Sequence, residues 1–118
     1  MIYLDASCLV KLYADEPGAG AVVAWAEGQS DFVCAAHGRL ELFSALRRHH
    51  REGSLTGPGL RALIQQVEKD ESSGLVCWLP VSTDLIATAC QQVLALPSSV
   101  FVRAADALHL ACAADSGG

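Results

Sequence analysis

The sequence predicts an α/β protein in which a parallel sheet lies between helices on both of its faces. The alternation of two kinds of segment along the chain predicts this class. Short apolar runs that suit buried strands alternate along the chain with longer segments whose apolar residues recur at helical spacing. The chain has 118 residues, enough for one core, and neither a linker nor a repeat interrupts it, so we expect a single domain over residues 1–118.

Three apolar segments are predicted to be the strands: residues 1–4 (MIYL), 31–35 (DFVCA) and 75–81 (LVCWLPV). Each is short and nearly free of charge, as expected of strands inside a parallel sheet. Such sheets bind ligands beyond the carboxyl ends of their strands. Asp5 follows the first run directly and therefore marks the predicted place of a site.

The first half of the chain is predicted to hold three helical pieces. Residues 8–28 form two of them, separated at Pro17 and Gly18, and Pro17 is predicted to be the first residue of the second piece. The third piece is predicted over residues 38–53 and is closed by Gly53. The sequence around its start is CAAHGRLE, with alanines and a glycine where a capping side chain is usual, so we expect an uncapped start.

The second half of the chain is predicted to hold three more helices. Thr56 is predicted to cap the first of them, which ends in the charged stretch EKDESSG. Either Ser82 or Thr83 is predicted to cap a helix over residues 84–96. The last helix is predicted over residues 103–118 and is closed by its glycines.

The composition limits the class of protein. Apolar residues make up 52% of the chain and charged residues 18%, which is typical of globular proteins rather than disordered ones. No apolar run has the length of a membrane span and no basic segment precedes the first run, so we expect a cytoplasmic protein without membrane contact. The cysteines are odd in number, form no CxxC pair and lie in apolar segments, which predicts reduced core thiols at Cys8, Cys34, Cys77, Cys90 and Cys112.

The charge is unevenly distributed. The net charge of −5 argues against nucleic-acid affinity spread over the whole surface. Half of the eight Lys and Arg residues nevertheless fall close together, at Arg39, Arg47, Arg48 and Arg51, with His49 and His50 among them. The sequence thus predicts a local basic patch on an acidic body, although a run of this kind is also the ordinary solvated face of a helix.

Three carboxylates interrupt apolar patterns: Asp5 after IYL, Glu41 in LELFSAL and Asp106 in AADALHLACA. Burying even one unpaired ionised carboxylate costs several kcal/mol, so three that face one another need a compensating positive charge. Oxygen ligands of this kind suit Mg²⁺ or Mn²⁺. An ion held in this way can polarise a phosphoryl oxygen and activate a water, which is the chemistry of phosphodiester hydrolysis.

Each of these residues also has a structural interpretation. Asp5 can cap the helix that follows it, with Ser7 in a local turn. Glu41 can face solvent, and Asp106 can form a weak surface ion pair with Arg103 one turn earlier. Spacing alone does not join the three carboxylates.

The histidines do not predict a zinc site. His49 and His50 are adjacent and point apart, and His37 stands alone in the sequence. His109 follows Asp106 by three residues and is more typical of a hydrogen-bonded core histidine than of a metal ligand.

Taken in order, MIYLDASCLVKLY, RLELFSALRR and RAADALHLACA resemble the three successive motifs of the PIN-domain ribonucleases, in particular the VapC-type toxins of bacterial toxin–antitoxin systems. The resemblance extends over nearly the whole chain and implies a PIN-like three-layer fold. It also implies that Asp5, Glu41 and Asp106 are the catalytic, metal-binding carboxylates. Ser7, in the motif DAS, would orient a metal-binding residue from behind or bind the metal through a water.

The resemblance further implies a Mg²⁺- or Mn²⁺-dependent endoribonuclease that cuts tRNA or another structured RNA. Such toxins are homodimers, and a cognate antitoxin silences them by inserting a segment over the acidic site. If the substrate is RNA, the basic patch can bind its phosphates, and we assign these contacts to Arg47, Arg48 and Arg51.

This chain departs from the family pattern after DALHLA. There the family continues into a strand that carries a fourth acidic residue and then into a closing helix, and we expect both to be missing here. Asp115 does not replace the fourth acid, because it lies nine residues after Asp106 and about 13 Å further along the same helix. The missing strand would also leave an open sheet edge.

A second function therefore stands beside the ribonuclease: a catalytically weak or inactive PIN-fold binding module that dimerises and binds an antitoxin without cleaving RNA. The absent fourth carboxylate favours this module, whereas the three carboxylates that are present favour the enzyme. A nucleotide-binding α/β protein is not expected, because no glycine-rich phosphate loop follows the predicted strands.

Overall fold

A three-stranded parallel sheet lies at the centre of the computed structural model, which describes residues 1–29 and 31–115. The strands are β1 (Ile2–Tyr3), β2 (Phe32–Ala35) and β3 (Val76–Leu79), in the spatial order β1-β2-β3. In the register, Ile2 pairs with Phe32 and Phe32 pairs with Val76. The predicted parallel sheet is confirmed.

The central strand β2 separates two cores. All four of its residues are buried, as expected for a strand with a neighbour on each side. Successive side chains of a strand point to opposite faces, so Phe32 and Cys34 pack on one side with Leu9, while Ala35 packs on the other side with Leu85. The sheet is therefore covered on both faces, as predicted.

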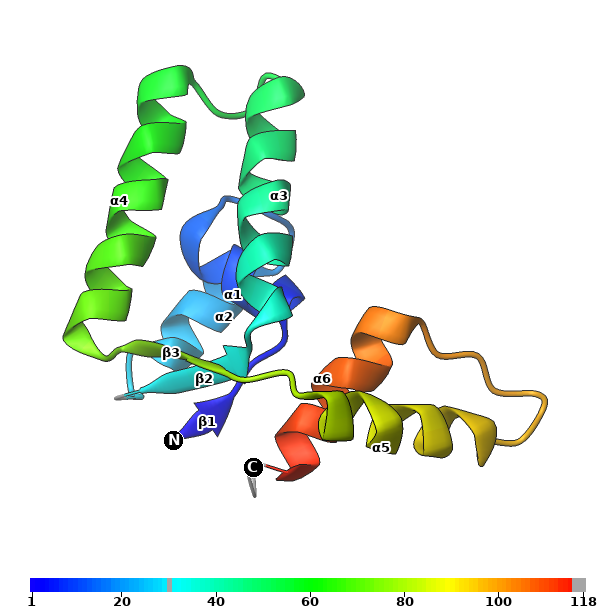
Figure 1. Cartoon of the computed structure of the whole chain (residues 1–118). Coiled ribbons are helices and arrows are strands. Elements are labelled where there is room, and N and C mark those ends of the chain that lie inside the picture. Colours follow the sequence, from blue (N-terminus) through cyan, green and yellow to red (C-terminus); the bar gives the residue numbers. More distant parts are fainter. Residues whose placement is uncertain (30, 116–118) are drawn as a thin grey trace.

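Four helices lie on the first face (Figure 1). They are α1 (Ala6–Tyr13), α2 (Ala19–Ala26), α3 (His37–Arg51) and α4 (Gly57–Ser73). Figure 1 shows α3 and α4 standing side by side above the sheet. The core beneath them is built from residues of α1, α3 and α4, together with the C-cap residue of α1, that are less than a tenth exposed: Val10, Ala14, Leu42, Leu46 and Val67.

Two helices lie on the opposite face (Figure 1). They are α5 (Thr83–Leu94) and α6 (Ala104–Asp115), which pack against each other, and α6 also contacts β2. Leu85 of α5 and Ala111 of α6 close the second core. This placement brings α6, from the far end of the sequence, next to the strand that immediately precedes α3.

Side-chain caps fix several helix starts where the sequence predicts them. The hydroxyl of Thr56 accepts a hydrogen bond from the Gly59 amide at 3.0 Å, and that of Ser82 accepts one from the Leu85 amide at 3.1 Å. Ser82, not Thr83, is thus the cap of α5. The start of α3 at Ala36 has no side-chain cap, as predicted.

One predicted helix start is wrong. Pro17 does not open the second helical piece, because α2 begins at Ala19 and its N-cap is Gly18. Gly18 has a φ of 86°, a left-handed conformation that glycine adopts without strain, and this residue turns the chain between α1 and α2. The predicted closure of α6 by its final glycines lies outside the described residues.

The prediction that all five cysteines are core residues is wrong for two of them. All five are free thiols, and Cys34 and Cys112 are buried, but Cys77 and Cys90 are exposed. Cys77 lies on β3, an edge strand that lacks a neighbour on one side within the described sheet. Among the described residues, no helix is both long and apolar enough to cross a membrane.

Candidate functional site

Asp5 lies just beyond the carboxyl end of β1 and is the N-cap of α1. Its Oδ1 accepts a hydrogen bond from the Cys8 amide at 3.0 Å and another from the Ser7 hydroxyl at 2.8 Å. Burial opposes ionisation of this carboxyl, but the two hydrogen bonds outweigh that effect, and the pKa of Asp5 lies below its ordinary value. The capping interpretation is confirmed, and it leaves an ionised carboxylate on an exposed residue at the sheet edge.

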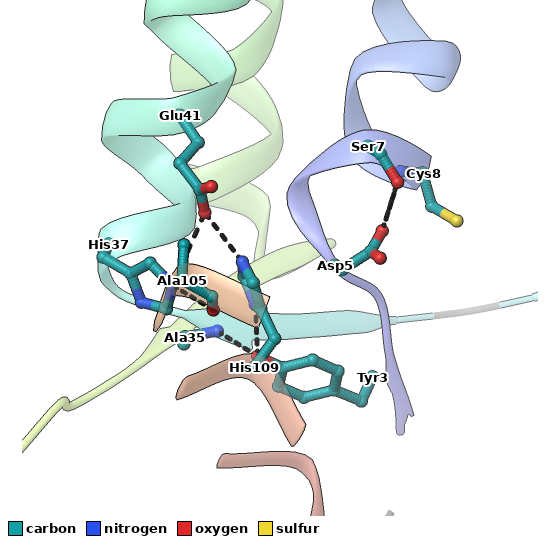
Figure 2. A network of polar contacts seen from close by, with 9 residues as sticks. All are labelled: Tyr3, Asp5, Ser7, Cys8, Ala35, His37, Glu41, Ala105 and His109. Atoms are coloured by element: carbon teal, nitrogen blue, oxygen red, sulfur yellow. Dashed lines mark hydrogen bonds and ion pairs between the residues drawn. The ribbon is translucent and has the colours of Figure 1, made fainter. Parts of the chain in front are cut away.

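Glu41 is only partly exposed to solvent, because its carboxylate contacts a histidine. Its Oε1 lies 2.7 Å from Nε2 of His109, which comes from α6 (Figure 2). The other nitrogen of His109, Nδ1, lies 2.8 Å from the hydroxyl of Tyr3, and that hydroxyl accepts a hydrogen bond from the Ala35 amide at 3.1 Å. This chain of contacts ties β1, β2, α3 and α6 together around one buried imidazole.

The protonation of Tyr3 fits this arrangement. Burial raises the pKa of Tyr3 above its ordinary value, so the phenol keeps its proton and can donate it. The contacts suit the histidine tautomer in which Tyr3 donates to Nδ1 of His109, and Nε2–H of the same ring donates to Glu41. The expected role of His109 as a hydrogen-bonded core histidine is confirmed.

His37 is the third member of this cluster. It stands alone in the sequence, but in the structure it contacts both Glu41 and His109. It precedes Glu41 by one helical turn, and its Nε2 lies 3.5 Å from Oε1 of Glu41. The His37 and His109 rings are in contact, with their centroids 4.3 Å apart and their planes tilted by 40°. The four-residue spacing of His37 and Glu41 was a sequence signal for the contact between these two residues. No such signal existed for His109, which reaches them only through the tertiary fold.

Gly38 permits this close approach of α6 to α3. A Cβ atom added at Gly38 would lie 2.3 Å from Sγ of Cys34 and 3.3 Å from Cε1 of His109. No side chain fits into that space, so the glycine lets the base of α3 sit against β2 and the histidine. Burial, followed by the charges on Glu41 and Asp5, raises the pKa of the Cys34 thiol to about 12.

Asp106 and Asp5 border the same cavity. This cavity has a volume of about 390 Å³, and its lining comes from β1, α1 and α6: Tyr3, Leu4, Asp5, Cys8, Asp106, His109, Leu110 and Ala113. No ion pair joins Asp106 to Arg103 within the described part of the chain, which leaves the Asp106 carboxylate exposed in the first turn of α6. Asp115, on the same helix, borders a different hollow beside Ser82 and Asp84.

The three predicted carboxylates thus do not line a single cavity. Asp5 and Asp106 share the cavity, and Glu41 adjoins it through His109, which both lines the cavity and contacts Glu41. Among the described residues, the ligand atoms of His37, Glu41 and His109 lie within 4.8 Å of one another, and the three carboxylates form no group that close.

The basic patch is divided as well. Arg47, Arg48 and Arg51 are exposed at the far end of α3, away from the sheet, and none of them forms an ion pair with another described residue. Arg39 is not available in the same way, because its Nε donates to Glu71 at 2.6 Å and its guanidinium lies over the ring of Phe43. RNA contact by the first three arginines stays a prediction, whereas Arg39 pairs with Glu71.

Comparison with known proteins gives three results. A family model described as PIN domain matches residues 2–118. The fold is similar to the crystal structure of Mycobacterium tuberculosis VapC20, which is described as a sarcin–ricin loop cleaving toxin, with a TM-score of 0.73 and 20% sequence identity over 99% of this chain and 84% of that one. No curated protein matched the sequence.

Proposed function

Because this chain belongs to the PIN-domain family, we propose that it is a ribonuclease toxin which hydrolyses RNA phosphodiester bonds with the help of Mg²⁺ or Mn²⁺. The family match over residues 2–118 supports a nuclease, and the described activity of VapC20 supports RNA as the substrate class. The observation that carries the proposal is the shared cavity of Asp5 and Asp106, two carboxylates from opposite ends of the sequence.

The donor chemistry of this cavity fits a hard divalent cation. Carboxylate oxygens are the ligands that Mg²⁺ and Mn²⁺ accept in proteins, together with waters and substrate phosphate oxygens. Asp5 and Asp106 would hold the ion from the cavity, and Glu41 would reach it from α3. When bound, the ion would polarise a phosphoryl oxygen and lower the pKa of a bound water.

The residues around the carboxylates have supporting roles. The Ser7 hydroxyl and the Cys8 amide fix Oδ1 of Asp5 and keep this carboxyl ionised, since both hydrogen bonds favour the charged form. His109 holds the Glu41 carboxylate beside the cavity, and Tyr3 holds His109 in turn. An in-line attack by water also needs an oriented phosphate, and the exposed Arg47, Arg48 and Arg51 would bind neighbouring phosphates of the RNA.

Three further properties belong to this proposal: a cytoplasmic location, a cognate antitoxin that blocks the acidic site, and a homodimer. An exposed apolar groove supports the existence of a partner surface. It lies between α5 and α6, has a volume of about 460 Å³ and includes Ile86, Val93 and Leu108. Leu94 and Phe101, which are 85% exposed, lie on the same part of the chain. An apolar surface of this kind is typical of protein–protein contact sites.

The second candidate is a PIN-fold module that binds an antitoxin but cuts RNA weakly or not at all. One observation favours it: Glu41 is bound to His109, and the three carboxylates do not converge to within 4.8 Å in the described chain. A cavity with two carboxylates binds a divalent ion less tightly than one with three or four.

Cleavage of RNA by the purified chain separates the two candidates. We expect cleavage in Mg²⁺ or Mn²⁺, its loss in EDTA and its recovery when the ion is restored. Asp106→Asn should abolish cleavage, whereas Asp115→Asn, the same change on the same helix but away from the cavity, should not. If the folded wild-type chain leaves RNA intact in both ions, the binding module is the correct function.

A further inference from the structure

We propose that His37, Glu41 and His109 bind a transition-metal ion of the zinc class, at a site that shares only Glu41 with the proposed magnesium site. Two imidazoles and one carboxylate are the ligands of many mononuclear zinc centres. Magnesium, in contrast, prefers oxygen ligands, so the two imidazoles select a different ion from the one that Asp5 and Asp106 would hold. The proposal goes beyond the ribonuclease function and does not depend on it.

The distances between the ligand atoms suit a tetrahedral ion. Zinc–ligand bonds of about 2.0–2.1 Å at tetrahedral angles place neighbouring ligand atoms about 3.3 Å apart. Here Nε2 of His37 lies 3.5 Å from Oε1 of Glu41, and Nε2 of His109 lies 2.7 Å from the same oxygen. All three ligand atoms lie within 4.8 Å of one another, so small side-chain rotations are enough to reach the geometry of a bound ion.

The surroundings of His109 resemble those of a metal-binding histidine. Such a histidine usually donates its second ring N–H to a fixed acceptor, which orients the ring. With an ion on Nε2, the proton of His109 would move to Nδ1, which lies 2.8 Å from the Tyr3 oxygen (Figure 2). This oxygen is fixed by the Ala35 amide, which donates a hydrogen bond to it at 3.1 Å.

His37 is the least satisfied polar side chain of the cluster. Its Nδ1 is buried and has no hydrogen-bond partner, and its Nε2 has only long contacts, 3.4 Å to the Ala105 carbonyl oxygen and 3.5 Å to Glu41. An ion bound to Nε2 would replace these weak contacts with a coordination bond. In such a site His109 would be a buried ligand, since its side chain is only 6% exposed. The side chain of Glu41 is 36% exposed, so water or a fourth ligand can reach the ion from that side.

Cobalt binding tests this proposal without any measurement of RNA cleavage. Co²⁺ is a spectroscopic substitute for Zn²⁺, and the purified chain, free of any histidine tag, should bind one equivalent and show visible d–d bands that Zn²⁺ then displaces. The spectrum should lack a thiolate charge-transfer band, because none of the cysteines belongs to the cluster. Absence of binding, or the presence of the thiolate band, would overturn the assignment.

Matched variants locate the ion. His37→Gln should weaken Co²⁺ binding by about tenfold or more, whereas His50→Gln, the same change on an exposed residue of the same helix, should leave it unchanged. Glu41→Gln, at a half-exposed position, should weaken it as well and does not depend on altering the buried His109. Equal affinity in the wild type and in His37→Gln would contradict the site.

The same experiment separates this site from the proposed catalytic one. Asp106→Asn should keep Co²⁺ binding, because Asp106 is not a member of the cluster, although it should lose Mg²⁺-dependent cleavage. Loss of Co²⁺ binding in Asp106→Asn would place the ion among the carboxylates and overturn the proposal. Failure of RNA cleavage with intact Co²⁺ binding would overturn the proposed function alone.

Discussion

Nε2 of His109 lies 2.7 Å from Oε1 of Glu41, so a histidine near the end of the chain holds a glutamate on the helix that follows the second strand. Tyr3 fixes the other side of the imidazole from β1. The position of Glu41 therefore depends on how α6 packs against α3 and β2. It also depends on Gly38, which leaves room for that packing.

Gly38→Ala should destabilise the protein, although alanine is the better helix former. The added Cβ would lie 2.3 Å from Cys34 Sγ, and overpacking of this kind costs about 1–3 kcal/mol. That cost exceeds the gain of up to about 1 kcal/mol from helix propensity. Urea denaturation measures the difference in the free energy of unfolding.

Gly20→Ala is the matched control, because Gly20 holds the same position in α2 with no atom within 4 Å of an added Cβ. This variant should be neutral or slightly stabilising. Equal stability of the two variants would contradict the tight packing at Gly38.

Much of the fold follows from local sequence features. The hydroxyls of Thr56 and Ser82 mark helix starts because they accept backbone hydrogen bonds, and short apolar runs mark strands because both faces of the sheet are covered. The turn at Pro17 was predicted incorrectly because Gly18, with its left-handed backbone, takes over the capping position. Cys77 and Cys90 were misplaced because apolar neighbours do not reveal which strand lies at an edge or which helix face has no cover.

The candidate site was only partly predictable for the same reason. Asp5 is a local feature, visible as a charge at a strand end followed by a helix. The contacts of His109 with Glu41 and Tyr3 join residues 68 and 106 positions apart, and no local pattern specifies them. His37 and Glu41 are one turn apart on α3, so this half of the cluster was within reach of a sequence argument.

The Arg39–Glu71 ion pair should make stability depend on pH. The hydrogen bond from Arg39 lowers the pKa of Glu71 below its ordinary value of 4.5, although burial opposes this shift. The contribution is therefore present above the pKa of the unfolded chain, near that ordinary value, and is lost as the pH falls through the lower folded-state pKa. We expect Glu71→Gln to be less stable than the wild type at pH 7, with a difference that shrinks below about pH 4.5.

Thermal denaturation across this pH range measures the difference in stability between Glu71→Gln and the wild type. Glu68→Gln, exposed on the same helix, is the control, and a difference for Glu71→Gln that stays constant with pH would contradict the ion pair.

The cysteines should react in two classes. Cys77 and Cys90 are exposed and should be alkylated in the native protein. Cys34 is fully buried, and its pKa of about 12 keeps it a thiol, so it should react only after unfolding. Peptide mapping by mass spectrometry after a short exposure to iodoacetamide identifies the modified residues. Labelling of Cys34 at the rate of Cys77 would show that the core around Gly38 and His109 is open.

The exposed arginines of α3 should contribute to RNA affinity through electrostatics. In a cleavage-deficient Asp5→Asn background, replacing both Arg47 and Arg51 with glutamine should weaken RNA binding and flatten the dependence of log K on log salt by about 0.7–0.9 per lost phosphate contact. Arg39→Gln on the same helix should change this slope little, because Glu71 already pairs with Arg39. Filter binding at several salt concentrations measures the slope. An unchanged slope in the double variant would exclude this surface as the RNA contact.

The most direct test of the central claim, that Asp5 helps to hold the catalytic ion, is the rate of RNA cleavage by Asp5→Asn in saturating Mg²⁺. Asparagine caps a helix as well as aspartate does, so the variant removes the charge and keeps the start of α1. Asp84→Asn, an equivalent change in the first turn of α5, is the control. We predict that Asp5→Asn lowers the rate by about 100-fold or more, since a bound ion contributes several kcal/mol of transition-state stabilisation, and that Asp84→Asn cleaves at the wild-type rate. A folded Asp5→Asn that cleaves as fast as the wild type would contradict the account.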